Sequence, residues 1–93
     1  MVDTERFDWD DANIDHIALH GIEPDDTEEA IRDPKRVRTR AQPGVETRSA
    51  VIGSTESGRI LFVVYTYRGR KTRVVTAREA GQWQRRKYEE RGK

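Results

Sequence analysis

Arginines recur in this 93-residue chain at spacings that suit phosphate binding. After Lys35 every second residue is an arginine, and on a β-strand the three would share one face: Arg36, Arg38 and Arg40. A guanidinium group stays charged and can bind two phosphate oxygens at once. The run therefore predicts a contact for an RNA backbone or for an acidic protein segment. A second interpretation is an edge strand that its charges protect from aggregation.

Two histidines offer a different chemistry. His16 and His20 lie four residues apart, as in helical zinc motifs, but the glutamate of an HExxH motif is missing and the chain has no cysteine. We therefore expect no metal site and no cofactor. His20 suits proton transfer near neutral pH, and it also suits a cap on the last carbonyls of a helix that ends before Gly21. Both roles stay open.

The charges are sorted along the chain. Residues 1–33 hold twelve acidic and two basic side chains, a net charge of −10. Residues 34–93 hold sixteen basic and five acidic ones, a net charge of +11. This asymmetry indicates a basic surface for polyanions beside an acidic segment. The other interpretation is two solvated surfaces that neutralise each other across the fold.

Length and composition restrict the class of protein. The length suits one small domain over residues 1–93, and without cysteine there is no disulfide framework. No apolar run approaches the roughly 20 residues that span a bilayer, and the acidic start lacks an apolar signal region. We expect a cytoplasmic protein that makes no contact with a membrane.

Local patterns predict the elements that would position these residues. Asp10 suits the N-cap of a first helix that ends at Gly21, and Pro24 the start of a second that ends by Asp33. Strand patterns follow at residues 37–41, 47–54, 60–65 and 73–75, with the continuous apolar run 60–65 as the central strand. Thr76 and Glu79 match a capping box that would open a last helix. The order predicts an α+β fold: a small twisted antiparallel sheet of three to four strands, two N-terminal helices and one C-terminal helix.

The chain resembles the BrnT toxin family. Its opening matches the family pattern F-x-W-D, then N, then K-H-G-V, at Phe7-Asp8-Trp9-Asp10, Asn13 and His20-Gly21-Ile22. The later matches follow in the family's order: Arg48, Gly53, Gly58-Arg59, the strand 61–66, Arg73-Val74-Val75-Thr76-Ala77-Arg78, Ala80 and Tyr88. Together the matches cover nearly the whole chain.

This resemblance implies a RelE-like fold and the function of an endoribonuclease toxin in a type II toxin–antitoxin pair. A ribbon-helix-helix antitoxin would neutralise the toxin. The complex would repress its own operon through the antitoxin, so this chain would contact DNA only indirectly.

The resemblance also suggests site residues. RNA cleavage without a metal needs a base for the ribose 2′-hydroxyl, cations for the charge that develops on phosphorus, and an acid for the leaving oxygen. The matched arginines Arg48, Arg73 and Arg78 would bind phosphate, unless they are solvated strand residues. His20 and Tyr88 complete the catalytic candidates, although Tyr88 also suits packing beside Trp83. Further candidate RNA contacts are Arg36, Arg38, Arg40, Arg59, Arg85 and Arg86.

Two departures from the family pattern motivate an alternative. Leu19 stands where the family usually has lysine, and Gln84 where it often has glutamate. The chain would then be a non-catalytic RNA- or protein-binding module that kept the toxin fold. Direct DNA binding has less support, because the basic run 85–87 is short and acidic residues follow it.

Overall fold

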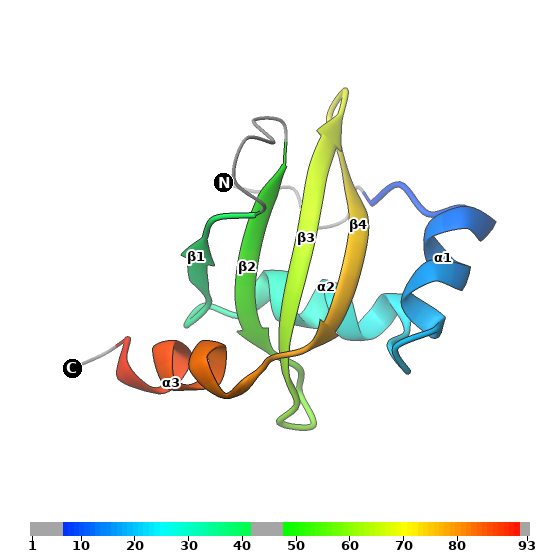
Figure 1. Cartoon of the computed structure of the whole chain (residues 1–93). Helices are drawn as coiled ribbons and strands as arrows, with labels where there is room; N and C mark the ends of the chain where they lie inside the picture. Colours follow the sequence, from blue (N-terminus) through cyan, green and yellow to red (C-terminus); the bar gives the residue numbers. More distant parts are fainter. Residues whose placement is uncertain (1–6, 42–47, 92–93) are drawn as a thin grey trace.

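The computed structural model describes residues 7–41 and 48–91, which form three helices and a four-stranded antiparallel sheet. In chain order the elements are α1 (Asp11–Ala18), α2 (Pro24–Arg32), β1 (Val37–Thr39), β2 (Ser49–Ser54), β3 (Ile60–Arg68), β4 (Lys71–Glu79) and α3 (Gln82–Glu90). The strands lie side by side in the order β1-β2-β3-β4. In Figure 1, α2 lies behind the sheet, α1 beside β4, and α3 near the lower ends of the strands. The predicted α+β class is confirmed.

The first two helices begin and end as their local signals predict. The Asp10 carboxylate accepts the Asn13 N–H at 3.2 Å, and the Asn13 side chain accepts the Asp10 N–H at 2.9 Å. Gly21, with φ +72°, provides the left-handed residue after α1. Pro24 opens α2, because its fixed φ suits the first helical position. No helix in the described parts of the chain is long and apolar enough to cross a bilayer.

The predicted start of the last helix is wrong. Thr76 to Glu79 form the end of β4, and α3 begins only at Gln82 after the N-cap residue Gly81. Pairing with β3 continues as far as Leu61 opposite Glu79, so the sheet's hydrogen bonds outweigh the local capping signal. The cap comes from Gln84 instead, whose Oε1 accepts the Gly81 N–H at 2.9 Å.

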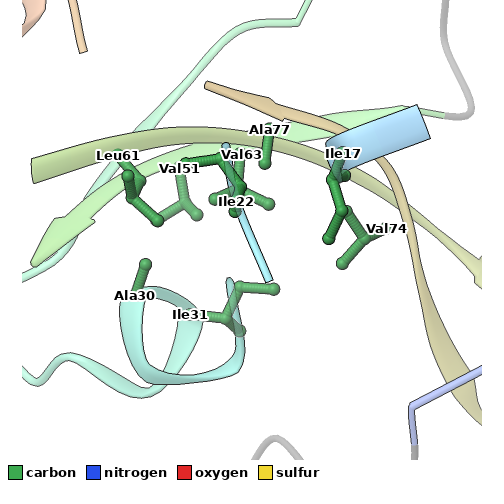
Figure 2. Close-up of a cluster of buried hydrophobic side chains, with 9 residues drawn as sticks. All are labelled: Ile17, Ile22, Ala30, Ile31, Val51, Leu61, Val63, Val74 and Ala77. Carbon is green, nitrogen blue, oxygen red and sulfur yellow. The ribbon is translucent and has the colours of Figure 1, made fainter. Parts of the chain in front are cut away.

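Side chains from both faces of the sheet are buried. On the face covered by α2, a cluster joins α1, α2 and the three longer strands (Figure 2). Its members are Ile17, Ile22, Ala30, Ile31, Val51, Leu61, Val63, Val74 and Ala77. Because side chains alternate along a strand, Ile52 points to the opposite face, where it packs with Ile60 and Ala80 beside the α3 residue Tyr88. The run 60–65, predicted as the central strand, lies between β2 and β4 and packs side chains on both faces.

Helix α2 packs very closely on β2. At Gly53 a Cβ atom would lie 2.1 Å from the carbonyl oxygen of Ala30, so only glycine fits between the strand and the helix backbone. The apolar layer around Ala30 therefore depends on this contact.

A β-bulge in β4 decides which way its arginines point. Val64 pairs with Thr76 but Tyr65 pairs with Val74, so Val75 is an extra residue in β4. Beyond the bulge Thr66 pairs with Arg73, and before it Phe62 pairs with Arg78. Phe62 and Thr66 lie four residues apart and thus share a face, so Arg73 and Arg78 share it too. We call this face, opposite α2, the front face.

The start of the chain closes the outer edge of β4. Phe7 forms a parallel bridge with Thr72, and the Asp8 N–H donates to the Thr72 carbonyl at 2.9 Å. Residues 7–10, which we call the N-terminal arm, thus dock along the edge of β4. The arm brings its two carboxylates, Asp8 and Asp10, beside Arg73 of β4.

Candidate functional site

A pocket of about 430 Å³ is lined by α1, β3, β4 and the residue that precedes β2. Its walls are Ala12, Asn13, His16, Arg48, Thr66, Arg68, Arg73, Val74 and Val75. It thus combines Arg48 and Arg73, two arginines that the sequence selected, with a third, Arg68, and with a histidine. Three guanidinium groups around one hollow favour an anion such as phosphate.

Asn13 fixes α1 against β4 and so shapes the pocket. Its buried side-chain amide donates to the carbonyl oxygens of Asp8 at 2.9 Å and Val74 at 3.2 Å. One turn further along the helix, His16 Nε2 lies 3.1 Å from Thr76 Oγ1 of β4. The helix therefore presents His16 at a defined place in the pocket wall.

Arg73 is held by the acidic residues of the N-terminal arm. Its side chain is only 15% exposed, and its Nη1 lies 3.1 Å from Asp10 Oδ2 and 3.6 Å from Asp8 Oδ1. The hydrogen bond from Arg73 lowers the pKa of Asp10, and the same bond raises the pKa of Arg73. Arg68 pairs with Asp8 at 3.4 Å. Part of the acidic segment thus neutralises part of the basic half, while Arg48 forms no ion pair within residues 7–41 and 48–91.

Arg78 lies elsewhere on the front face. Its guanidinium carbon is 4.9 Å from the centroid of the Phe62 ring, and its Nη1 is 3.3 Å from Gln84 Oε1. Phe62 and Thr66 are four residues apart on β3, so Arg78 and Arg73 are separated by about 13 Å along the strands. The three matched arginines share one sheet face, but only Arg48 and Arg73 share the pocket.

The two departures from the family pattern have different surroundings. Leu19 is 80% exposed and contributes nothing to the core. Gln84 accepts from both the Gly81 N–H and Arg78, as a glutamate carboxylate would at this place. The substitution of glutamine therefore retains both contacts while removing a negative charge.

His20 does not line the pocket. It is exposed in the turn after α1, and its ring centroid is 6.0 Å from that of His16. In the described ranges, no three histidine, aspartate or glutamate side chains gather closely enough to hold a metal ion.

Tyr88 contacts a half-buried carboxylate at the other end of the sheet. Its hydroxyl donates to Asp33 Oδ2 at 2.5 Å, and Asp33 also accepts the backbone N–H groups of Ser54 at 2.8 Å and Lys35 at 2.9 Å. Burial by itself raises the pKa of Asp33, but these hydrogen bonds outweigh burial and lower it. Burial, and then the bond to Asp33, raise the pKa of Tyr88. Tyr88 lines a separate pocket of about 470 Å³ and ties α3 to the end of α2.

We predict that Tyr88→Phe lowers the free energy of unfolding by about 1 kcal/mol at pH 7, because Asp33 loses a hydrogen-bond donor. The pKa of Asp33 is lower in the folded protein than in the unfolded chain, where it is about 3.9. Such a carboxylate stabilises the fold at pH values above its unfolded-state pKa, and the contribution is lost as the pH falls through its folded-state pKa. The difference between wild type and variant should therefore shrink below about pH 4. Urea unfolding at pH 7 and pH 3 measures it, with Glu89→Gln on the same helix as the control. Equal stability at pH 7 would contradict the prediction.

Arg59, a predicted RNA contact, is engaged inside the protein. Its guanidinium lies 3.1 Å from Glu79 Oε1 and 3.5 Å from Asp26 Oδ2, and it donates to the Gly21 carbonyl at 3.3 Å. These contacts join α2, the turn after α1 and the end of β4. Arg59 therefore connects these three parts of the fold. A phosphate could bind its guanidinium only by competing with these contacts.

The other predicted RNA contacts lie in and beside β1 and on α3. Strand β1 is shorter than the predicted 37–41 and contains only Arg38 of the alternating run. Arg36 donates to the Asp33 carbonyl at 3.1 Å, while Arg38 and Arg40 are exposed. Arg85 and Arg86 are exposed on α3 and do not line the pocket.

Sequence reasoning missed two pocket residues. His16 was considered only as a zinc partner of His20, although Asn13 and His16 lie three residues apart and so share a helix face. A buried asparagine on that face is the signal that the helix has a polar contact there. Arg68 lies beyond the predicted strand 60–65, but β3 continues as far as Arg68.

Comparison with known proteins identifies a matching family. A family model described as a ribonuclease toxin, BrnT, of type II toxin–antitoxin systems matches residues 9–83. The matched range includes all the pocket residues. A search of curated proteins finds no match.

Proposed function

The chain belongs to the BrnT family of ribonuclease toxins of type II toxin–antitoxin systems, and we propose that it cleaves RNA at the pocket lined by Arg48 and Arg73. The observation that carries this proposal is the meeting of arginines from separate strands beside His16 in one pocket of the front face. The pocket offers both a fixed positive charge and a group that exchanges protons.

The arginines would stabilise the charge that develops on phosphorus during cleavage. Arg73 is fixed by Asp8 and Asp10, so it needs little reorganisation when the substrate binds. A guanidinium has five N–H donors, so Arg73 can keep a carboxylate contact and still bind phosphate. Arg48 is exposed and supplies charge without such a contact in the described residues. We propose that this chemistry proceeds without a metal ion.

We further propose that the antitoxin is a ribbon-helix-helix protein that covers the front face. An acidic segment of the antitoxin would complement Arg48 and Arg78, which are both exposed there. Co-expression of such an antitoxin should restore growth that the toxin arrests. DNA binding would then belong to the antitoxin's own domain.

A cleavage assay on single-stranded RNA, with and without EDTA, tests the proposed function. We expect the wild type to cut RNA in both conditions and Arg48→Ala to slow cleavage about 10- to 100-fold, the effect of one charged hydrogen bond of about 1.5–3 kcal/mol. Arg86→Ala on α3, exposed and away from the pocket, is the matched control.

RNA that stays intact in both conditions, while a known ribonuclease toxin cuts it, would contradict the proposal. RNA binding without cleavage would instead identify the non-catalytic module. Thermal unfolding of each variant separates lost activity from lost folding.

A further inference from the structure

We infer that His16, not the motif residue His20, is the catalytic base of the proposed RNA cleavage; this inference rests on the proposed function. His16 lines the same pocket as Arg48 and Arg73, so an RNA phosphate bound by these arginines would lie beside the imidazole. His20 lies outside this lining, in the turn that follows α1.

Contacts on both sides fix the place of His16. Asn13, one turn earlier, ties α1 to β4 through its bond to the Val74 carbonyl at 3.2 Å. Thr76 Oγ1 lies 3.1 Å from His16 Nε2 and orients the ring. The second ring nitrogen, Nδ1, has no hydrogen bond within residues 7–41 and 48–91, so it is available for a proton.

The proposed step transfers one proton and exchanges one bond at phosphorus. The imidazole of His16 takes the proton of the ribose 2′-hydroxyl, and the 2′-oxygen forms a bond to phosphorus. The bond from phosphorus to the 5′-oxygen breaks, and that oxygen takes a proton from water. His16 then gives its proton to the hydroxide left behind, which leaves a 2′,3′-cyclic phosphate and a free 5′-hydroxyl.

Charged groups from each neighbouring element face His16. They are Arg48 before β2, Arg68 of β3, Arg73 of β4, and His20 after its own helix. On its own helix, Asp15 precedes His16 in the sequence. The carboxylates of Asp8 and Asp10 are paired with Arg73 and Arg68. These groups are the same in variants of His16, so a changed pH profile reports on the imidazole itself.

Single-turnover cleavage of a single-stranded RNA oligonucleotide across a range of pH tests the inference. We expect His16→Gln to slow cleavage by about 100-fold with little change in RNA affinity. The cleavage rate of this variant should no longer fall when the pH is lowered, as the wild-type rate should. His20→Gln, the matched control, should retain the wild-type profile. Added imidazole should partly rescue His16→Ala, which a structural role would not allow.

The outcomes separate the inference from the proposed function. If His16→Gln cuts RNA at the wild-type rate while Arg48→Ala is slow, His16 is not the base but the pocket remains the site. If His20→Gln alone loses the acid side of the profile, the base is His20 and the inference is overturned. An oligonucleotide with 2′-deoxyribose at the cleaved position should resist the wild type, and its cleavage would overturn the proposed step.

Discussion

Replacing Gly53 with alanine is expected to destabilise the protein by about 3 kcal/mol or more, which is a large part of the stability of a domain this small. The new Cβ would lie 2.1 Å from the Ala30 carbonyl oxygen and 2.8 Å from its carbonyl carbon. Both are backbone atoms of α2 and cannot rotate away. The helix would have to move off β2, and the cluster around Ala30 and Val51 would open.

Gly81→Ala is the matched control for this prediction. The nearest heavy atom to a Cβ at Gly81 is Gln84 Oε1 at 3.7 Å, an ordinary contact, so this change should cost only the N-cap preference for glycine, about 1 kcal/mol or less. Thermal unfolding followed by circular dichroism measures both variants. Similar melting temperatures for Gly53→Ala and Gly81→Ala would contradict the close packing of α2 on β2.

The double variant Arg48→Ala with Arg73→Ala should lose RNA cleavage by about 10²- to 10⁴-fold. Each guanidinium is expected to contribute about 1.5–3 kcal/mol through charged hydrogen bonds to the phosphate. Because both residues line one pocket, their effects should depend on each other, and the double variant should not show the simple sum of the single changes.

Arg85→Ala with Arg86→Ala is the control of equal charge. Both residues are exposed on α3, so their loss should affect RNA affinity modestly and the cleavage rate little. Arg73→Ala also leaves Asp10 without its cation and Asp8 with Arg68 alone, so unfolding in urea must accompany the assay. If the α3 pair lowers cleavage more than the pocket pair, the catalytic site lies at α3 and the pocket is not the site.

Elements with local signals were predictable from the sequence, and those decided by distant pairing were not. Asp10 and Gly21 act on neighbouring residues of α1, so the local pattern sufficed for both ends of that helix. The segment Thr76 to Glu79 carries an equally good local signal for a helix, yet β3 pairs with it throughout. A pattern read along the chain gives no measure of this long-range competition.

The residues of the candidate site also differ in whether a local pattern or a long-range contact reveals them. The resemblance selected Arg48 and Arg73, and the pocket contains both. His16 was not selected, because its role depends on a contact with Thr76, 60 residues away in the sequence. Nor does the sequence reveal the extra residue at Val75, which alone brings Arg73 to the same face as Arg78.

The bulge separates the direction of a side chain in β4 from its place in the sequence. Arg73 and Arg78 are five residues apart, a spacing that would put them on opposite faces of a regular strand. Because Val75 is the extra residue, Arg73 still lies opposite Thr66 and Arg78 opposite Phe62. Loss of the single codon for Val75 would remove the bulge and keep both pairs, so both guanidinium groups would stay on the front face and only the wall that Val75 forms would change.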